Sequence, residues 1–123
     1  RIKTHENCGG KVWNVIYEDL TFHNVKSPIE IDMFYGDPGD DDKTTMHIDN
    51  ITFTRISSSN PDVQAYINCH PDSPCTNMQF YDLSFEGDDW GCDNDDCCNN
   101  IKSWDVNNVA PPGLSKCLDD SYD

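Results

Sequence analysis

Positive charge is scarce in this sequence. The 123 residues include 8 Lys and Arg against 23 Asp and Glu, which gives a formal net charge of −15. Such a charge repels polyanions, so we expect neither nucleic acid nor an anionic membrane as a partner. No apolar run approaches the roughly 20 residues that span a bilayer, and no leader segment is recognisable. We therefore expect any targeting segment to have been removed or to lie outside these residues.

Helical patterning is also missing, whereas strand patterning is plentiful. Segments such as VWNVIYEDLTF, MHIDNITFTRI and VQAYINC alternate β-branched or aromatic residues with polar ones. This alternation is typical of strands. No useful length of chain has apolar residues at helical spacing. The sequence therefore predicts an all-β fold.

The cysteines lack the spacing of a metal site. No pair shows the two-residue gap of a zinc knuckle, and the four histidines are scattered, so we expect neither a metal nor another cofactor. Seven cysteines in a chain of this size instead favour disulfides and an oxidising compartment. Because the count is odd, one is left over, which suggests further chain. They are Cys8, Cys69, Cys75, Cys92, Cys97, Cys98 and Cys117.

One glycosylation sequon accompanies the cysteines. Asn50-Ile51-Thr52 is the only Asn-x-Ser/Thr triplet in the sequence, and such triplets mark glycan attachment in secreted proteins. Together with the cysteines it favours an extracellular protein, with Asn50 as the predicted attachment site.

An internal repeat is the most informative feature. Four asparagines coincide when WNVIYEDLTF, DNITFTRISS, TNMQFYDLSF and NNIKSWDVNN are aligned: Asn14, Asn50, Asn77 and Asn100. They are separated by 36, 27 and 23 residues (50 − 14, 77 − 50 and 100 − 77). Repeats of this length made of strands predict three to four stacked coils of a parallel β-helix. We expect the asparagines to form a hydrogen-bonded ladder at a turn.

The same alignment predicts the core. Apolar residues recur at fixed offsets after each asparagine, and we expect them to point inward. They are Val15, Tyr17, Leu20, Ile51, Phe53, Ile56, Met78, Phe80 and Leu83.

The chain opens on two cations that flank one apolar residue. In an extended strand Arg1 and Lys3 project to one side while Ile2 points to the other. Two cations on one face form half of an anion-binding site.

Several of these motifs together resemble a known family. RIKT, VWNVIYEDLTFHNVKSPIEIDMFYG, IDNITFTRIS, CHPDSPCTNMQFYDLSF, CCNNI and PPGLSKCL are similar to the last third of a polygalacturonase of glycoside hydrolase family 28. The likeness runs over nearly the whole chain. It is sharpest at Arg1-Ile2-Lys3, at the stretch from Pro28 to Tyr35, and in the hairpin from Cys69 to Cys75.

The resemblance implies a fold and an activity. Members are secreted, right-handed parallel β-helices that cleave α-1,4-galacturonan in pectin by water attack with inversion. Their catalytic carboxylates lie in Asn-Thr-Asp and Asp-Asp motifs, followed by Gly-His-Gly, all before the Arg-Ile-Lys. None stands at its place here, since Asp40-Asp41-Asp42 and Asp95-Asp96 come later. We therefore expect residues 1–123 to form the C-terminal coils only, with no catalytic residue, and the preceding coils of the same protein to complete the domain.

The resemblance also implies binding residues and disulfides. Arg1 and Lys3 match the pair that grips the substrate carboxylate, and Tyr35 matches a tyrosine of the same cleft, so the implied partner is an acidic polysaccharide. Cys69–Cys75 and Cys98–Cys117 match family disulfides. Cys92–Cys97 is expected from proximity, which leaves Cys8 over.

Two acidic runs have no implied role. GDPGDDD and EGDDWGCDNDD contain the Gly and Pro of loops, and we interpret them as solvated faces. A calcium site is the alternative, although the spacing fits no calcium-loop motif.

Two functions from different classes remain. The chain is expected to belong to a pectinase-type glycosidase and to be inactive by itself, or else to a non-catalytic extracellular structural or carbohydrate-binding β-helix module. Fold alone does not separate the two.

Overall fold

The computed structural model describes residues 1–39, 45–91 and 97–122. Within these ranges no helix is long and apolar enough to cross a membrane. The elements, in chain order, are strands β1 (Ile2–Lys3), β2 (Lys11–His23), β3 (Ile29–Asp32), β4 (His47–Ser59), β5 (Ala65–Asn68), β6 (Thr76–Phe85), β7 (Cys98–Asn99) and β8 (Trp104–Ala110), and the short helix α1 (Leu114–Asp119).

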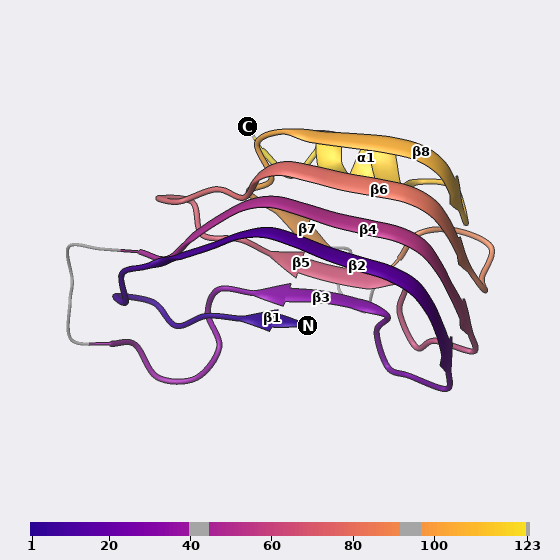
Figure 1. The fold of residues 1–123 in the computed structure, drawn as a ribbon, viewed down its shortest axis with the longest axis horizontal. Helices are drawn as coiled ribbons and strands as arrows, with labels where there is room; N and C mark the ends of the chain where they lie inside the picture. Colours follow the sequence, from indigo (N-terminus) through magenta and orange to yellow (C-terminus); the bar gives the residue numbers. More distant parts are fainter. Residues whose placement is uncertain (40–44, 92–96, 123) are drawn as a thin grey trace.

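The strands form two parallel sheets that face each other across the core (Figure 1). One four-stranded sheet has the order β1-β3-β5-β7 and the other β2-β4-β6-β8. Each strand therefore pairs with the equivalent strand of the next coil, and each coil contributes one strand to each sheet. This arrangement confirms the predicted parallel β-helix.

Residues with positive φ stack at the corners of the coils. Asn14, Asn50 and Asn77 have φ of 58°, 56° and 53°, a conformation that asparagine tolerates better than most residues. The Asn50 Nδ2 donates to Asn14 Oδ1 at 2.7 Å. A second column consists of Asp19, Arg55, Asp82 and Asn108, and a third of Asn24, Asn60 and Gly87.

The ladder changes its chemistry between the second and third coils. Asn77 Nδ2 donates to Asp49 Oδ1 at 2.8 Å rather than to Asn50, and Thr76 Oγ1 donates to the same oxygen at 2.6 Å. The hydrogen bonds from Thr76 and then Asn77 lower the pKa of the Asp49 carboxyl. The hydrogen bond between the first two coils is therefore neutral, and those between the second and third coils are charge-assisted.

The predicted place of Asn100 in this column is wrong. β8 pairs with β6 so that Met78 lies beside Trp104, and this register shifts the last coil by three residues relative to the asparagine alignment. Ser103 occupies the position next to Asn77, whose backbone N–H donates to Ser103 Oγ at 2.7 Å. Asn100 instead donates from Nδ2 to the Cys69 carbonyl. The register of the last coil therefore follows the stacking of apolar side chains. It does not place an asparagine at the corner position beside Asn77.

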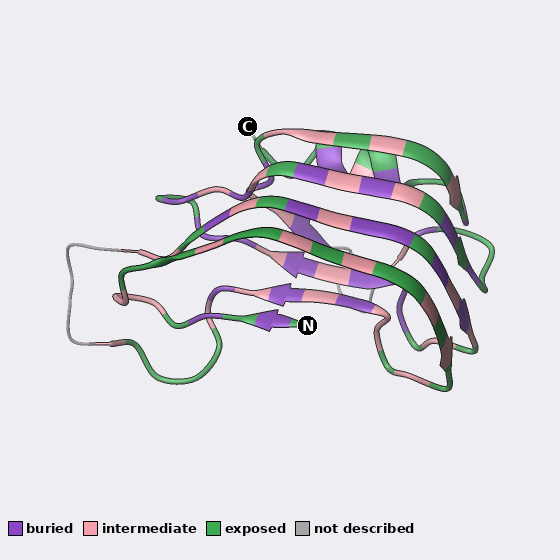
Figure 2. Cartoon of the chain, in the orientation of Figure 1, coloured by how far each residue is buried: buried purple, intermediate pink, exposed green. Residues whose placement is uncertain are grey.

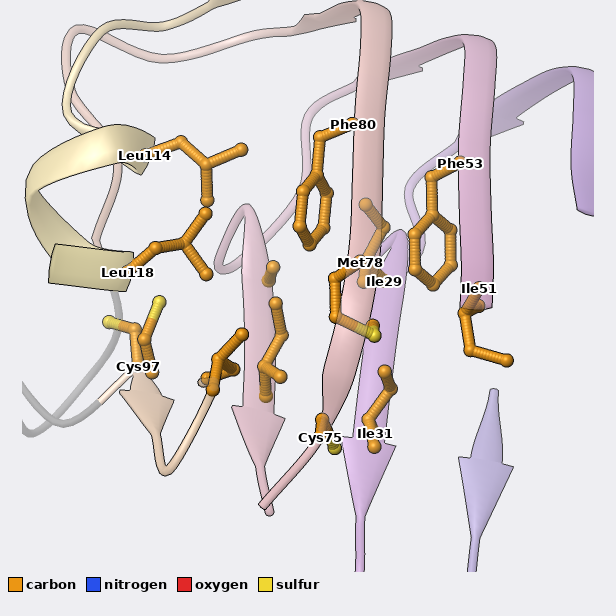
Figure 3. Packing of buried hydrophobic residues seen from close by; sticks show 14 of the residues in the cluster. Ile29, Ile31, Ile51, Phe53, Cys75, Met78, Phe80, Cys97, Leu114 and Leu118 are labelled. Atoms are coloured by element: carbon orange, nitrogen blue, oxygen red, sulfur yellow. The ribbon is translucent and has the colours of Figure 1, made fainter. Parts of the chain in front are cut away.

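The core lies between the two sheets and is densest in the middle coils. The Phe53 and Phe80 rings stack with centroids 5.6 Å apart (Figure 3). The Tyr17 ring stacks on the other face of this column, with its centroid 5.2 Å from that of Phe53. The six predicted core residues of β4 and β6 are all at most 4% exposed, namely Ile51, Phe53, Ile56, Met78, Phe80 and Leu83.

The three predicted core residues of β2 point to the same side but are only half-buried (Figure 2). Val15, Tyr17 and Leu20 pack against the core, and this partial burial raises the pKa of the Tyr17 hydroxyl. β2 has β4 on one side and no strand on the other among the described residues. Within the described structure, the inner side of β2 therefore lacks the contacts that a coil stacked on its other edge would supply.

The opposite end of the core is closed by α1, which the sequence did not predict. Leu114 and Leu118 of this helix are each 1% exposed and point toward the interior (Figure 3). The Cys98–Cys117 disulfide joins the helix to β7. The last coil is thus covered by a short amphipathic element.

The structure pairs Cys69 with Cys75 and Cys98 with Cys117, as the family resemblance implies. Cys8 is a free thiol. The predicted Cys92–Cys97 pair includes Cys92, which lies outside the described residues, so this pair stays a prediction.

Candidate functional site

The outer face of β1 and β3 presents four charged side chains. Ile2 pairs with Ile31 and Lys3 with Asp32 in the parallel register. Both isoleucines are buried, so alternation along the strands turns the residues beside them outward. Arg1, Lys3, Glu30 and Asp32 therefore share one face, as the alternation predicts for the two cations.

Tyr35 lies with both cations, although it is distant in the sequence. Lys3 Nζ is 3.9 Å from the centroid of the Tyr35 ring, and Arg1 Cζ is 6.0 Å from it. The Tyr35 backbone N–H donates to the Thr4 carbonyl at 3.0 Å, which fixes the loop after β3 against the end of β1. The three binding residues implied by the resemblance thus meet in one place, with the Tyr35 side chain 44% exposed.

The two cations differ in their partners. Arg1 Nη1 donates to Glu30 Oε2 at 3.0 Å, and both side chains are partly exposed. Among the described residues no carboxylate lies within ion-pair distance of Lys3. Lys3 is therefore the cation that a ligand carboxylate can reach without displacing an ion pair.

Asp32 stabilises the loop that follows β3. Its Oδ1 accepts the backbone N–H of Phe34 at 2.9 Å, an Asx turn that directs the chain from β3 toward Tyr35. The carboxylate beside Lys3 in the register is thereby used to shape the loop.

Two histidines line the same end of the molecule, and the sequence reasoning missed them. The His5 ring meets the Tyr35 ring edge-on at 6.2 Å. His70 is buried, stacks on Phe34 at 4.9 Å, and has its Nε2 3.4 Å from Glu6 Oε2. The spacing of the scattered histidines could not have predicted these contacts, because each contact depends on how neighbouring coils pair.

The acidic runs fall partly outside the described structure. Asp40, Asp41, Asp42, Asp95 and Asp96 are outside the described residues. Elsewhere in the described chain, no group of three or more His, Cys, Asp or Glu side chains is arranged to hold a metal ion.

Asn50 lies in the corner column with its side chain exposed. Its Nδ2, the atom that would carry a glycan, donates to Asn14 Oδ1. A glycan there would share this nitrogen with the ladder.

Comparison with known proteins defines the family. The model of the glycosyl hydrolases family 28 matches residues 1–110, so the chain belongs to this family. It is 28% identical over 122 residues to a polygalacturonase of Persea americana, with 96% of the chain and 25% of the relative covered. It is 31% identical over 124 residues to a polygalacturonase of Gossypium barbadense, again covering 96% and 25%.

A fungal relative is similar at the same level. Endopolygalacturonase D of Aspergillus niger is 30% identical over 102 residues, with 80% of the chain and 20% of the relative covered. The chain thus spans a fifth to a quarter of the length of these relatives. No solved structure matches at comparable significance.

Proposed function

We propose that this chain supplies the substrate clamp of a secreted, pectin-degrading hydrolase that cuts galacturonan. The observation that carries the proposal is the convergence of Arg1, Lys3 and Tyr35 on one outward face, with Lys3 Nζ 3.9 Å from the tyrosine ring centroid. The names of the relatives, which are polygalacturonases, support the same substrate class.

The clamp would bind a galacturonate residue through two kinds of contact. The Lys3 ammonium, which has no ion-pair partner within residues 1–39, 45–91 and 97–122, would donate charge-assisted hydrogen bonds to the carboxylate. The exposed Tyr35 ring offers an apolar surface for a sugar face, and its hydroxyl offers a hydrogen bond. Arg1 would add further donors on the same face, because a guanidinium that gives one N–H to Glu30 keeps others available.

The chemistry itself is proposed to lie in coils that precede β1. Inverting hydrolysis needs an acid and a base roughly 6.5–9.5 Å apart, and the family's catalytic motifs do not occur at their place in this sequence. The half-buried Val15, Tyr17 and Leu20 on β2 support a further coil stacked there. The chain alone is then expected to be inactive.

A non-catalytic extracellular β-helix module, with a structural or carbohydrate-binding role, is the second candidate. The net charge of −15 favours it, because a strongly acidic protein attracts a polyanionic substrate weakly unless the site is locally positive.

Hydrolysis by the full-length protein tests the proposal. Reducing ends released from polygalacturonate are measured for the wild type, Lys3→Ala and the control Lys102→Ala, which removes an exposed lysine from another coil. We expect Lys3→Ala to lower kcat/KM at least about tenfold, as loss of a charge-assisted contact predicts, and Lys102→Ala to leave it unchanged.

The other outcomes separate the candidates. Binding without hydrolysis, with binding lost in Lys3→Ala, would favour the module. An active enzyme that is indifferent to Lys3→Ala would contradict the clamp.

Secretion and glycosylation at Asn50 are part of the proposal. The sequon and the disulfides support an extracellular protein. Protein from a eukaryotic secretion host should lose mass on deglycosylation, and Asn50→Gln should abolish that loss. An unglycosylated secreted protein would contradict the assignment.

A further inference from the structure

The four outward side chains of β1 and β3 balance in charge. Arg1 and Lys3 contribute two positive charges, and Glu30 and Asp32 contribute two negative ones on the same face. A clamp that had only to attract a polyanion would carry an excess of cations. Here the carboxylates bring the clamp close to neutrality within a protein of net charge −15.

Of the two carboxylates, Glu30 is the one without a role in the local fold. Asp32 shapes the loop to Tyr35 by accepting the Phe34 N–H. The described contact of Glu30 is the ion pair with Arg1, whose side chain is 50% exposed. Exposed ion pairs contribute little to stability, so the pair is better explained by its effect on the site than by its effect on the fold.

On the basis of the proposed function, we propose that Glu30 is a specificity-determining residue that favours galacturonan with partly esterified carboxyl groups. Glu30 holds Arg1 across the strand pair and repels a second carboxylate near the clamp. Lys3 remains available for one free carboxylate. A neighbouring uronate carried as a neutral ester meets no repulsion from Glu30, whereas a free uronate does.

The structure supplies a matched control pair in the other sheet. Glu18 on β2 accepts from Arg55 Nη2 at 2.9 Å, again an exposed ion pair between neighbouring strands. Glu18→Gln removes the same charge, and turns the same kind of ion pair into a neutral hydrogen bond, at a place in the other sheet. A general effect of protein charge would appear in both variants, and a local effect in one.

The experiment measures kcat/KM of the full-length protein on de-esterified polygalacturonate and on the same polymer after partial methyl esterification, at low ionic strength. We expect Glu30→Gln to raise the ratio of de-esterified to esterified kcat/KM about fivefold, the effect of one solvent-screened charge at about 4 Å. Glu30→Asp keeps the charge and should keep the wild-type ratio. Added salt should shrink the difference.

The outcomes distinguish this inference from the proposed function. An active wild type whose ratio stays within twofold in Glu30→Gln, or shifts equally in Glu18→Gln, overturns the role of Glu30 and leaves the hydrolase intact. If the wild type binds both polymers without cleaving them, the ratio of Kd values from calorimetry is judged by the same criteria. A wild type that neither cleaves nor binds either polymer overturns both.

Discussion

The two ends of the stack bury their apolar side chains to very different degrees. At the C-terminal end, Leu114 and Leu118 of α1 fill the space beyond the last coil and are each 1% exposed. At the other end, the inward side of β2 is half-buried, with Val15, Tyr17 and Leu20 in contact with the core but open on one side. The last coil is covered by a helix, whereas β2 of the first coil has a neighbouring strand on one side only in the part of the chain that the structure describes.

The difference shows how a solenoid is stabilised. Each coil buries its apolar face only against its neighbours, so the terminal coils need a cap or another coil. The helix provides the cap with six residues. The residues of β2 have the same types and spacing as those of β4 and β6, so their exposure reflects position in the stack and not composition.

The largest expected effect comes from isolating the chain. Residues 1–123 expressed alone should self-associate and lack a sharp melting transition, because no strand of the described structure pairs with the second edge of β2 and its inner side is only half-buried. Analytical ultracentrifugation and thermal melting check this expectation. A monomer that melts cooperatively would contradict it.

A core substitution in the middle coil should affect stability more than the equivalent substitution at the open end. Phe53→Ala should lower the free energy of unfolding by roughly 3–5 kcal/mol. Truncation of its stacking partner on β2, Tyr17→Ala, should shift the apparent urea midpoint of the isolated chain by less than half as much as Phe53→Ala does. Urea titration measures both. If preceding coils are present in the full-length protein, the two costs should converge there.

Removing the disulfide of the cap should have the next largest effect. Replacing Cys98 and Cys117 by serine opens a bond between residues 19 apart, which should cost about 3 kcal/mol by loop entropy. Replacing Cys69 and Cys75, which are 6 residues apart, by serine should lower the free energy of unfolding by about 2 kcal/mol. Equal losses in urea titrations of the two variants would argue against a role of loop length.

The smallest effect concerns the corner ladder and pH. Because the folded state lowers the pKa of Asp49, its carboxylate stabilises the fold at neutral pH, and this contribution is lost as the pH falls below about 4. Thr76→Val removes the strongest donor and should reduce this pH dependence. The change in the free energy of unfolding should be under about 1 kcal/mol, because solvent screens the hydrogen bond between Thr76 and the partly exposed Asp49 carboxylate.

A control for this prediction lies one coil earlier. Asn14 and Asn50 form a neutral hydrogen bond, so Asn14→Ala should shift stability equally at pH 7 and pH 3. Urea titrations at the two pH values measure both variants. A pH-dependent shift in Asn14→Ala would show that the ladder chemistry is not the cause.

The first three coils could be predicted from sequence because one spacing repeats in them. The offsets of Val15, Tyr17 and Leu20 recur in Ile51, Phe53 and Ile56. The last coil follows the same offsets in Trp104, Val106 and Val109. The asparagine alignment missed this because it weighted one polar residue above the apolar spacing, although apolar stacking contributes most of the burial energy.

The clamp could be predicted only in part. The shared face of Arg1 and Lys3 follows from strand alternation, and the family resemblance implied Tyr35. Glu30 could not be predicted because its contact with Arg1 depends on the register of β1 against β3, and β1 is too short to carry a repeat signal. The stacking of His70 on Phe34 depends in the same way on the pairing of coils.

The corner columns separate what is constant in this protein from what varies. Equivalent residues are 36 apart between β2 and β4, 27 between β4 and β6, and 26 between β6 and β8, yet the strands and their corners superpose. Variation in length is confined to the connections, where a residue can be added without moving the core. Such a scaffold can acquire new loops at the rim of its binding face while its interior stays the same, which makes it a tolerant host for evolutionary change and for engineered insertions.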